Sequence, residues 1–196
     1  MSRLGWIVLG LIVAAAGLFG SMLTIGGPGR MRAGRSLTVA LPLAPIAEQG
    51  VLAVPVAGVA RSAIRDSWGE AREGGARGHH GTDIMAAGGT PVLAAAAGTI
   101  EKLFDSDRGG TTLYQRSADG RWMFYYAHLA RYAADLHEGE RVAAGTVIGY
   151  VGDTGDAGPG NTHLHFGLAR MAPGERWWQG QDVDPYPLLA RSGRPR

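Results

Sequence analysis

Cysteine is absent from this chain of 196 residues. Its absence excludes disulfide bonds, thiolate nucleophiles and cysteine-based zinc sites, so any metal must be held by histidine and carboxylate side chains. An excess of one charge is also missing, because the net charge is only +2 and the arginines are not clustered with aromatic residues. The composition therefore predicts no nucleic-acid partner. No long amphipathic helix, heptad pattern or internal repeat is found, which argues against coiled coils and repeat arrays.

Glycine and short apolar runs are abundant instead. With 32 glycines and 45% apolar residues, the chain can turn often and still build a core. Turn-rich segments such as "DSDRGG" and "GDTGDAGPGN" separate the apolar runs, as antiparallel hairpins require. The sequence predicts a mainly β, antiparallel domain with one short helix at residues 130–136. The runs expected to form strands are 51–59, 91–104, 111–116, 122–129, 146–152 and 163–169.

The N-terminal segment differs from the rest of the chain. Residues 4–25 contain no charged side chain and match the ~20 residues that cross a bilayer as a helix. A transmembrane signal anchor is the first interpretation, and a cleaved signal peptide is the alternative. We therefore expect one N-terminal hydrophobic helix ahead of the domain. The predicted organisation is a membrane or signal segment at 1–26, a linker at 27–50, the main domain at 51–190 and a tail at 191–196.

The charges around this segment conflict with export of the domain. Both interpretations place the domain outside the cytoplasm. However, Arg30, Arg32 and Arg35 follow the segment, whereas only Arg3 and the amino terminus precede it. By the positive-inside tendency, this distribution favours a domain on the cytoplasmic side. The sequence leaves the topology open.

Two histidines stand one residue apart in the stretch "GPGNTHLHFGLA". Because strand side chains alternate between faces, His163 and His165 share one face. The residues predicted to pack into the core from the other face are Leu164, Phe166 and Leu168. The two imidazoles can bind one metal ion together, or one can bind metal while the other faces substrate. A polar pair on a solvated sheet face is the remaining alternative.

A second group of polar residues lies in "GHHGTDIMA". In an extended segment His79 and Asp83 point to the same side, so they are the pair that can chelate one ion. His80 points to the other side and is expected beside the site, with the ligand role as its alternative. Gly81 removes a side chain that would crowd the ion. A plain exposed turn is the alternative for the whole segment.

A third histidine ends the aromatic run "MFYYAHLA". Strict alternation places His128 on the face of Phe124 and Tyr126. Taken alone, a histidine in this position is a structural residue more often than a catalytic one. His137, in the polar segment "LHEGER", is predicted to be a solvated loop residue.

Four blocks in this order resemble the M23 zinc metallopeptidases of the lysostaphin and LytM type, which cut peptide bonds in peptidoglycan. They are "HHGTDIMAAGGTPVLAAAAGTI", "YYAHL", "EGERVAAGTVIGYVGDTG" and "THLHFGL". The resemblance implies an antiparallel β-sheet metallopeptidase domain of this type. It also implies that His79, Asp83 and His165 bind one zinc ion, and that His128 and His163 are catalytic.

This implied ligand set agrees with the chemistry of a catalytic zinc site. Three protein ligands leave a fourth position for water, whose pKa the ion lowers from ~15.7 toward ~7. His128 and His163 would take the proton of that water and stabilise the oxyanion. The expected function is zinc-dependent hydrolysis of peptidoglycan cross-links or stem peptides, with the zinc-bound water as nucleophile. The alternative is a non-catalytic M23-like envelope module that activates an amidase or scaffolds a cell-wall complex.

Partners and location follow from the same resemblance. Peptidoglycan is the expected substrate, and the N-terminal segment is expected to anchor the enzyme to the inner membrane, at the periplasmic or extracytoplasmic face of the cell envelope. Tyr126 and Asn161 are the candidates for substrate contact. The loop at residues 65–78 is expected to line the groove. Trp177 and Trp178 face opposite ways if extended, so at most one is buried; glycan stacking, packing and membrane contact are their alternatives.

Overall fold

The computed structural model describes residues 51–190 of the chain. The expected N-terminal hydrophobic helix, the linker at 27–50 and the tail at 191–196 lie outside the described residues. Within residues 51–190, no helix combines the length and the apolar character needed to cross a membrane.

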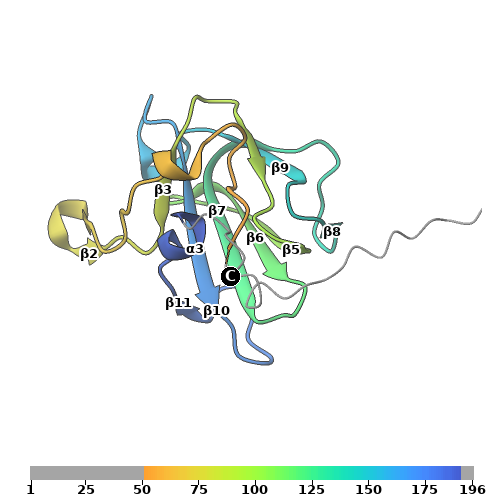
Figure 1. Cartoon of the computed structure of the whole chain (residues 1–196). Helices are drawn as coiled ribbons and strands as arrows, with labels where there is room; N and C mark the ends of the chain where they lie inside the picture. Colours follow the sequence, from red (N-terminus) through yellow and green to blue (C-terminus); the bar gives the residue numbers. More distant parts are fainter. Residues whose placement is uncertain (1–50, 191–196) are drawn as a thin grey trace, which may run out of the picture. The chain divides into compact units, whose positions relative to one another are not determined.

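Short strands make up most of the regular structure in this part of the chain (Figure 1). The strands are β1 (Ala71–Arg72), β2 (Arg77–Gly78), β3 (Thr82–Met85), β4 (Pro91–Leu93), β5 (Gly98–Ser106), β6 (Gly110–Ser117), β7 (Trp122–Tyr132), β8 (Arg141–Val142), β9 (Val147–Val151), β10 (His163–Arg170) and β11 (Gln181–Asp182). The helical elements are η1 (Arg61–Ala63), η2 (Glu73–Gly75), η3 (Gly155–Ala157) and α3 (Tyr186–Ala190).

A nine-stranded antiparallel sheet forms the body of the described domain. Its main path runs β11-β10-β7-β6-β5-β8, with β3 paired to β10 and with β9 paired to both β7 and β4. Figure 1 shows β10, β7 and β6 side by side, and β1 and β2 form a separate hairpin. The expectation of a mainly β, antiparallel domain is confirmed.

Two local predictions are wrong. Residues 51–59 form only an isolated bridge at Val56, because Pro55 has no N–H to donate within that run. Residues 130–136 are not a helix, since β7 continues to Tyr132 and pairs with β9. That pairing, together with the Arg131 guanidinium 3.6 Å from the centre of the Tyr150 ring, holds the segment extended.

The core lies on the face of β10 that the alternation predicted. Leu164 and Phe166 are fully buried and Leu168 nearly so. Phe124 and Tyr126 of β7 are buried on the same side, and the rings of Tyr126 and Phe166 pack edge to face. The apolar alternation of "HLHFGLA" is thereby confirmed.

Tyr126 is a core residue and not a substrate contact, which corrects the prediction made for it. Its side chain has no exposed surface. The hydroxyl donates to Oε1 of Gln115 at 2.7 Å and accepts the N–H of Ala95 at 2.9 Å. The phenol therefore satisfies buried polar groups between β6 and the segment before β5.

A bulge in β7 overturns the predicted face of His128. The register with β6 shifts between Leu129 and Tyr126, and His128 has a φ of 60°, a conformation that residues other than glycine rarely adopt. A bulge inserts one extra residue and re-aims the side chains that follow. His128 therefore does not share the buried face of Tyr126, and it lines a cavity on the other side of the sheet.

Replacing Tyr126 with phenylalanine tests its assignment to the core. The substitution leaves the Gln115 carbonyl without its buried donor, so the free energy of unfolding should fall by about 1–3 kcal/mol. Tyr132→Phe is the matched control, because its hydroxyl also donates to a carbonyl, that of Thr112, but is partly exposed to water. Urea unfolding of both variants measures the difference. Unchanged stability of Tyr126→Phe would contradict the assignment.

Candidate metal centre

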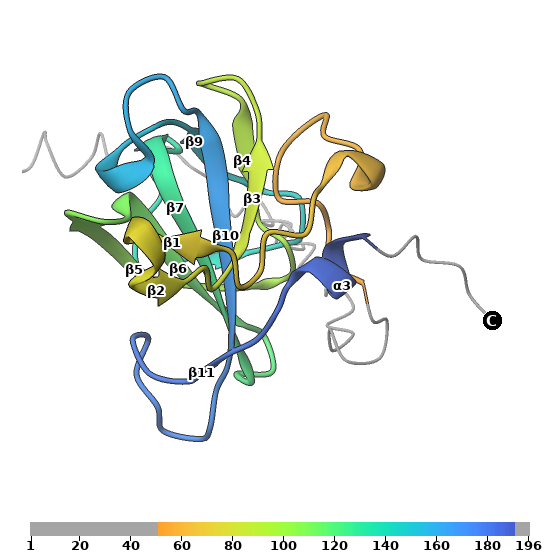
Figure 2. The same ribbon diagram turned by 90° about the vertical axis from the view of Figure 1, so that its left-hand side faces the viewer.

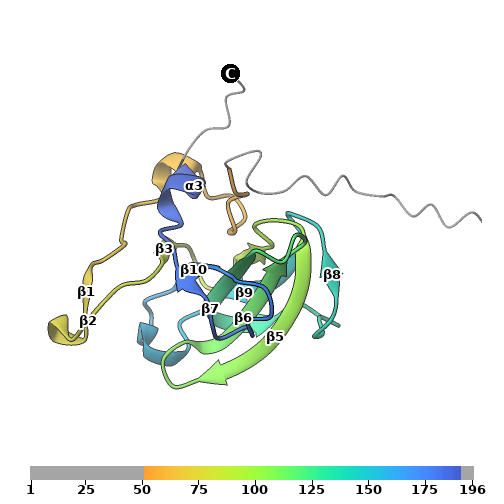
Figure 3. The ribbon, with the colours of Figure 1, turned by 90° about the horizontal axis from the view of Figure 1, so that it is seen from below.

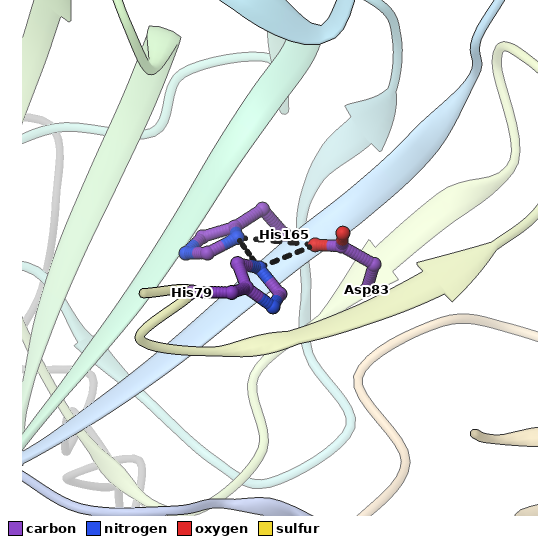
Figure 4. Close-up of side chains that lie close together, drawn as sticks. All are labelled: His79, Asp83 and His165. Carbon is purple, nitrogen blue, oxygen red and sulfur yellow. Dashed lines mark hydrogen bonds and ion pairs between the residues drawn. The ribbon is translucent and has the colours of Figure 1, made fainter. Parts of the chain in front are cut away.

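The antiparallel pairing of β3 with β10 brings the predicted ligands together. Asp83 is the direct register partner of His165, and His79 lies in the short connection between β2 and β3. Nε2 of His79 is 2.8 Å from Nδ1 of His165 and 3.0 Å from Oδ1 of Asp83 (Figure 4). Nδ1 of His165 is 3.1 Å from that same oxygen. Three potential ligand atoms thus converge on one point.

Two imidazole nitrogens and a carboxylate oxygen are a donor set that zinc accepts. Ligand atoms about 2.0–2.2 Å from one tetrahedral zinc ion lie roughly 3.4 Å apart, so the present separations need only small adjustments. Within residues 51–190, the ligand atoms of His79, Asp83 and His165 all lie within 4.8 Å of one another, close enough to share one metal ion. All three residues also line a cavity, which leaves a further position for water or substrate.

Gly81 makes room for this arrangement. A Cβ atom at this position would lie 2.6 Å from Cε1 and 2.7 Å from Nε2 of His165. Those separations are too short for any side chain, so the imidazole of His165 occupies space that only glycine leaves free. The sequence-based interpretation of Gly81 is supported, with His165 as the group that a side chain would displace.

Ser67 and Arg72 orient two of the ligands. Nδ1 of His79 donates to the Ser67 carbonyl at 2.7 Å, which leaves the lone pair of Nε2 facing the site. The Ser67 hydroxyl accepts the Asp83 N–H at 3.0 Å. Nη2 of Arg72 contacts Oδ2 of Asp83 at 2.5 Å, so Oδ1 remains directed at the histidines.

The charges of the ligands suit a cation. Burial raises the pKa of the Asp83 carboxyl, but its contacts with the His165 and His79 rings outweigh burial and hold that pKa well below its ordinary value. Burial lowers the pKa of His165, although Asp83 works in the opposite direction. An ionised carboxylate and a neutral imidazole are the forms that bind metal.

His128 and His163 lie beside the ligands. Nδ1 of His128 donates to the Thr154 carbonyl, and Nδ1 of His163 donates to the Asn161 carbonyl, both at 2.8 Å. A carbonyl can only accept, so in each neutral ring Nε2 carries the lone pair. The two ring centres are 4.9 Å apart. Burial lowers the pKa of His128, which favours its neutral form.

A cavity of about 400 Å³ adjoins this cluster of histidines. Arg72 and Arg77 of the β1–β2 hairpin line it. In Figure 2 that hairpin lies in front of β10, and Figure 3 shows it projecting away from the sheet. Nη2 of Arg77, in β2, is 3.4 Å from Oδ2 of Asp156 on η3. The charged and aromatic lining residues that the sequence had not identified individually are Arg72, Arg77, Arg108, Tyr125 and Asp156.

Only some of these lining residues could have been predicted from the sequence. Tyr125 could have been found, because it alternates with the buried Phe124 and Tyr126. The two hairpin arginines fall within residues 65–78, which were expected to line the groove but show no periodicity. Arg108 and Asp156 come from turn-rich connections, where spacing does not predict side-chain direction.

The remaining histidines and Asn161 also have defined positions. The His80 ring stacks on Trp68, with 5.5 Å between ring centres, and its Nδ1 is 2.8 Å from Oδ2 of Asp182. His80 is thus a neighbour of the site and not one of the converging ligands. Asn161 lines the cavity while its amide donates to the Ala157 carbonyl. His137 is part of an exposed turn, with Nδ1 3.0 Å from the Glu138 carbonyl oxygen.

Comparison with known proteins identifies relatives of this domain. Residues 77–185 match the sequence profile of peptidase family M23. An L-Ala–D-Glu endopeptidase of Bacillus subtilis is 37% identical over 131 residues, which cover 64% of this chain and 39% of that protein. The peptidoglycan DD-endopeptidase ShyC of Vibrio cholerae is 39% identical over 89 residues, covering 45% of this chain and 19% of that protein. The matched region spans less than half the length of either relative.

A solved structure supports the same relationship. The catalytic domain of lysostaphin from Staphylococcus simulans aligns with a TM-score of 0.53 and 31% sequence identity, over 64% of this chain and 90% of that domain. The antiparallel fold described above is therefore that of a lysostaphin-like catalytic domain.

Gly81→Ala tests the packing of the metal centre. The new Cβ must displace the imidazole of His165, and we expect zinc affinity to fall about 10–100-fold, the loss typical when a ligand's support is disturbed. Gly88→Ala is the control, since its Cβ would meet Cγ2 of Thr162 at 3.4 Å, an ordinary contact. Competition with a zinc chelator measures both affinities. Equal affinity in the two variants would contradict the arrangement.

Proposed function

The chain belongs to peptidase family M23, and from this premise we propose that it is a zinc-dependent endopeptidase that hydrolyses peptide bonds in peptidoglycan. The observation that carries the proposal is the convergence of His79, Asp83 and His165 beside two further histidines in one cavity. When bound by the three ligands, zinc would polarise the scissile carbonyl and acidify a water molecule.

His128 is the residue we assign as the proton acceptor. Its Nδ1–H is held by the Thr154 carbonyl, so Nε2 is the basic atom, and burial keeps the ring neutral to lower pH than usual. Nε2 lies 4.0 Å from Oδ1 of Asp156. That carboxylate would stabilise the imidazolium formed when His128 takes a proton.

We assign His163 to stabilise the negative charge that develops on the oxygen of the scissile carbonyl. Its Nε2 lies 3.8 Å from Oδ1 of Asp83 and therefore faces the metal centre. The Asn161 carbonyl fixes the orientation of the ring. A proton on this Nε2 would let the imidazole donate a hydrogen bond to an oxyanion formed next to the ligands.

The intact set of polar residues favours an enzyme over a non-catalytic envelope module. A module that only binds a partner needs no open three-ligand centre and no pair of histidines with oriented Nε2 atoms. All five residues are present here and line one cavity. We propose that the enzyme acts on the extracytoplasmic side of the cell envelope, with residues 1–26 as its membrane anchor or signal segment.

Digestion of purified sacculi tests this function. The full chain loaded with zinc should release peptide fragments, chelation should stop the release, and zinc should restore it. Mass spectrometry of the products identifies the bond, which the names of the relatives leave open because they cut different bonds. Zinc-loaded protein that releases no fragment from sacculi of any cross-link chemistry would contradict the proposal.

Alanine variants of His128 and His163 separate catalysis from metal binding. Loss of a general acid or base typically lowers turnover by about 10²–10⁴-fold, and neither residue belongs to the ligand set, so zinc content should stay at the wild-type level. His137→Ala, in an exposed turn, is the control and should retain activity. Wild-type turnover by either variant, measured as fragment release, would refute its assigned role.

A further inference from the structure

A second cavity adjoins the metal centre on the same face of β10, where His165, Gly167 and Ala169 line it. It has a volume of about 280 Å³, close to the lower limit of small-ligand sites (roughly 300 Å³). Arg77, Tyr125 and His165 line both this cavity and the one that holds the catalytic histidines. The two cavities are therefore neighbours that meet at these three side chains.

Aromatic rings form a continuous row along this second cavity. The ring centres are 5.8 Å apart between His165 and Tyr125, 4.7 Å between Tyr125 and Tyr114, 4.6 Å between Tyr114 and Trp177, and 5.2 Å between Trp177 and Trp178. We call Tyr114, Tyr125, Trp177 and Trp178 the aromatic shelf. It leads directly from a metal ligand to the molecular surface.

The two tryptophans have different environments. Trp177 is half-buried and packs against Phe104 and Tyr114. Trp178 is 56% exposed, and the Arg176 guanidinium lies 5.2 Å from its ring centre. Trp178 is thus the exposed end of the aromatic shelf, where a ligand can reach its ring.

Planar polar side chains surround the shelf. Gln179, Asp182 and His80 line the same cavity, and Asp182 is exposed and within hydrogen-bonding distance of His80. These groups argue against insertion of Trp178 into a membrane, because an exposed carboxylate is expensive in apolar surroundings. They also argue against a purely apolar peptide side chain as the occupant, since such a ligand would bury these polar groups away from water.

A sugar ring has the chemistry that this combination requires. One face of a pyranose presents C–H bonds, which pack on the electron-rich face of an indole or phenol. Its edge carries hydroxyl groups, and in an N-acetylated amino sugar also an acetamido group, which pair with carboxylate, amide and guanidinium side chains. The shelf offers both kinds of contact within one cavity.

We propose that the aromatic shelf binds the N-acetylated sugar rings of a peptidoglycan glycan strand while the attached peptide lies at the metal centre. This inference rests on the proposed function, because that function supplies a substrate whose peptide is joined to a glycan. The shelf then selects peptides that are still attached to sugar. Trp178 is its outermost stacking surface.

Sugar binding can be measured without hydrolysis. Saturation-transfer NMR would follow the disaccharide of N-acetylglucosamine and N-acetylmuramic acid in the presence of the full chain, with maltose as the sugar control. We expect saturable transfer to the amino-sugar protons with the wild type, at least tenfold weaker binding with Trp178→Ala, and recovery with Trp178→Phe. Tyr150→Ala is the matched protein control, since Tyr150 is also covered by an arginine but lines neither cavity.

The outcomes separate this proposal from the proposed function. No transfer to the disaccharide, equal transfer to maltose, or wild-type binding by Trp178→Ala would overturn the shelf, even if sacculi are cleaved. Binding that depends on Trp178 would support the shelf, even in a chain that cleaves no peptide bond.

Discussion

The pairing of β3 with β10 is the constraint on which the candidate metal centre depends. Residues 82–85 pair with 163–166, and this register places Asp83 opposite His165. A slip of one residue would turn both histidines of β10 toward the core and its apolar side chains toward the groove. The burial of Leu164 and Phe166 therefore fixes the positions of His163 and His165. The hydrophobic core and the donor set are two consequences of one register.

Backbone carbonyls outside the strands orient three of the histidine rings at the site. The carbonyls of Ser67, Thr154 and Asn161 each accept a hydrogen bond from Nδ1 of a different histidine, His79, His128 and His163 respectively. Backbone carbonyls do not titrate, so they fix the tautomer of each neutral ring over the pH range in which the protein is folded. The strands and the connection before β3 set where these imidazoles lie, and the accepting carbonyls set which nitrogen carries the lone pair.

The sequence predicted the parts of this arrangement that follow from strand periodicity. Alternation gave the two faces of β10 and the pairing of His79 with Asp83, and family resemblance supplied their expected roles. Strand alternation gave the wrong face for His128 and the wrong role for Tyr126, because a bulge separates the two residues. Nothing in the sequence "YYAHL" predicts that bulge. The arginines of the β1–β2 hairpin and Asp156 also escaped prediction, because their positions depend on how irregular segments fold over the sheet. The helix expected at residues 130–136 was overridden by pairing with β9.

The central claim is that His79, Asp83 and His165 hold one zinc ion. X-ray absorption spectroscopy of the zinc-loaded chain, combined with metal analysis, tests it most directly. The account predicts one zinc per chain with two imidazoles in its coordination shell, and one imidazole fewer in any zinc retained by His165→Ala. A wild-type shell without two imidazoles, or an unchanged shell in His165→Ala, would contradict it.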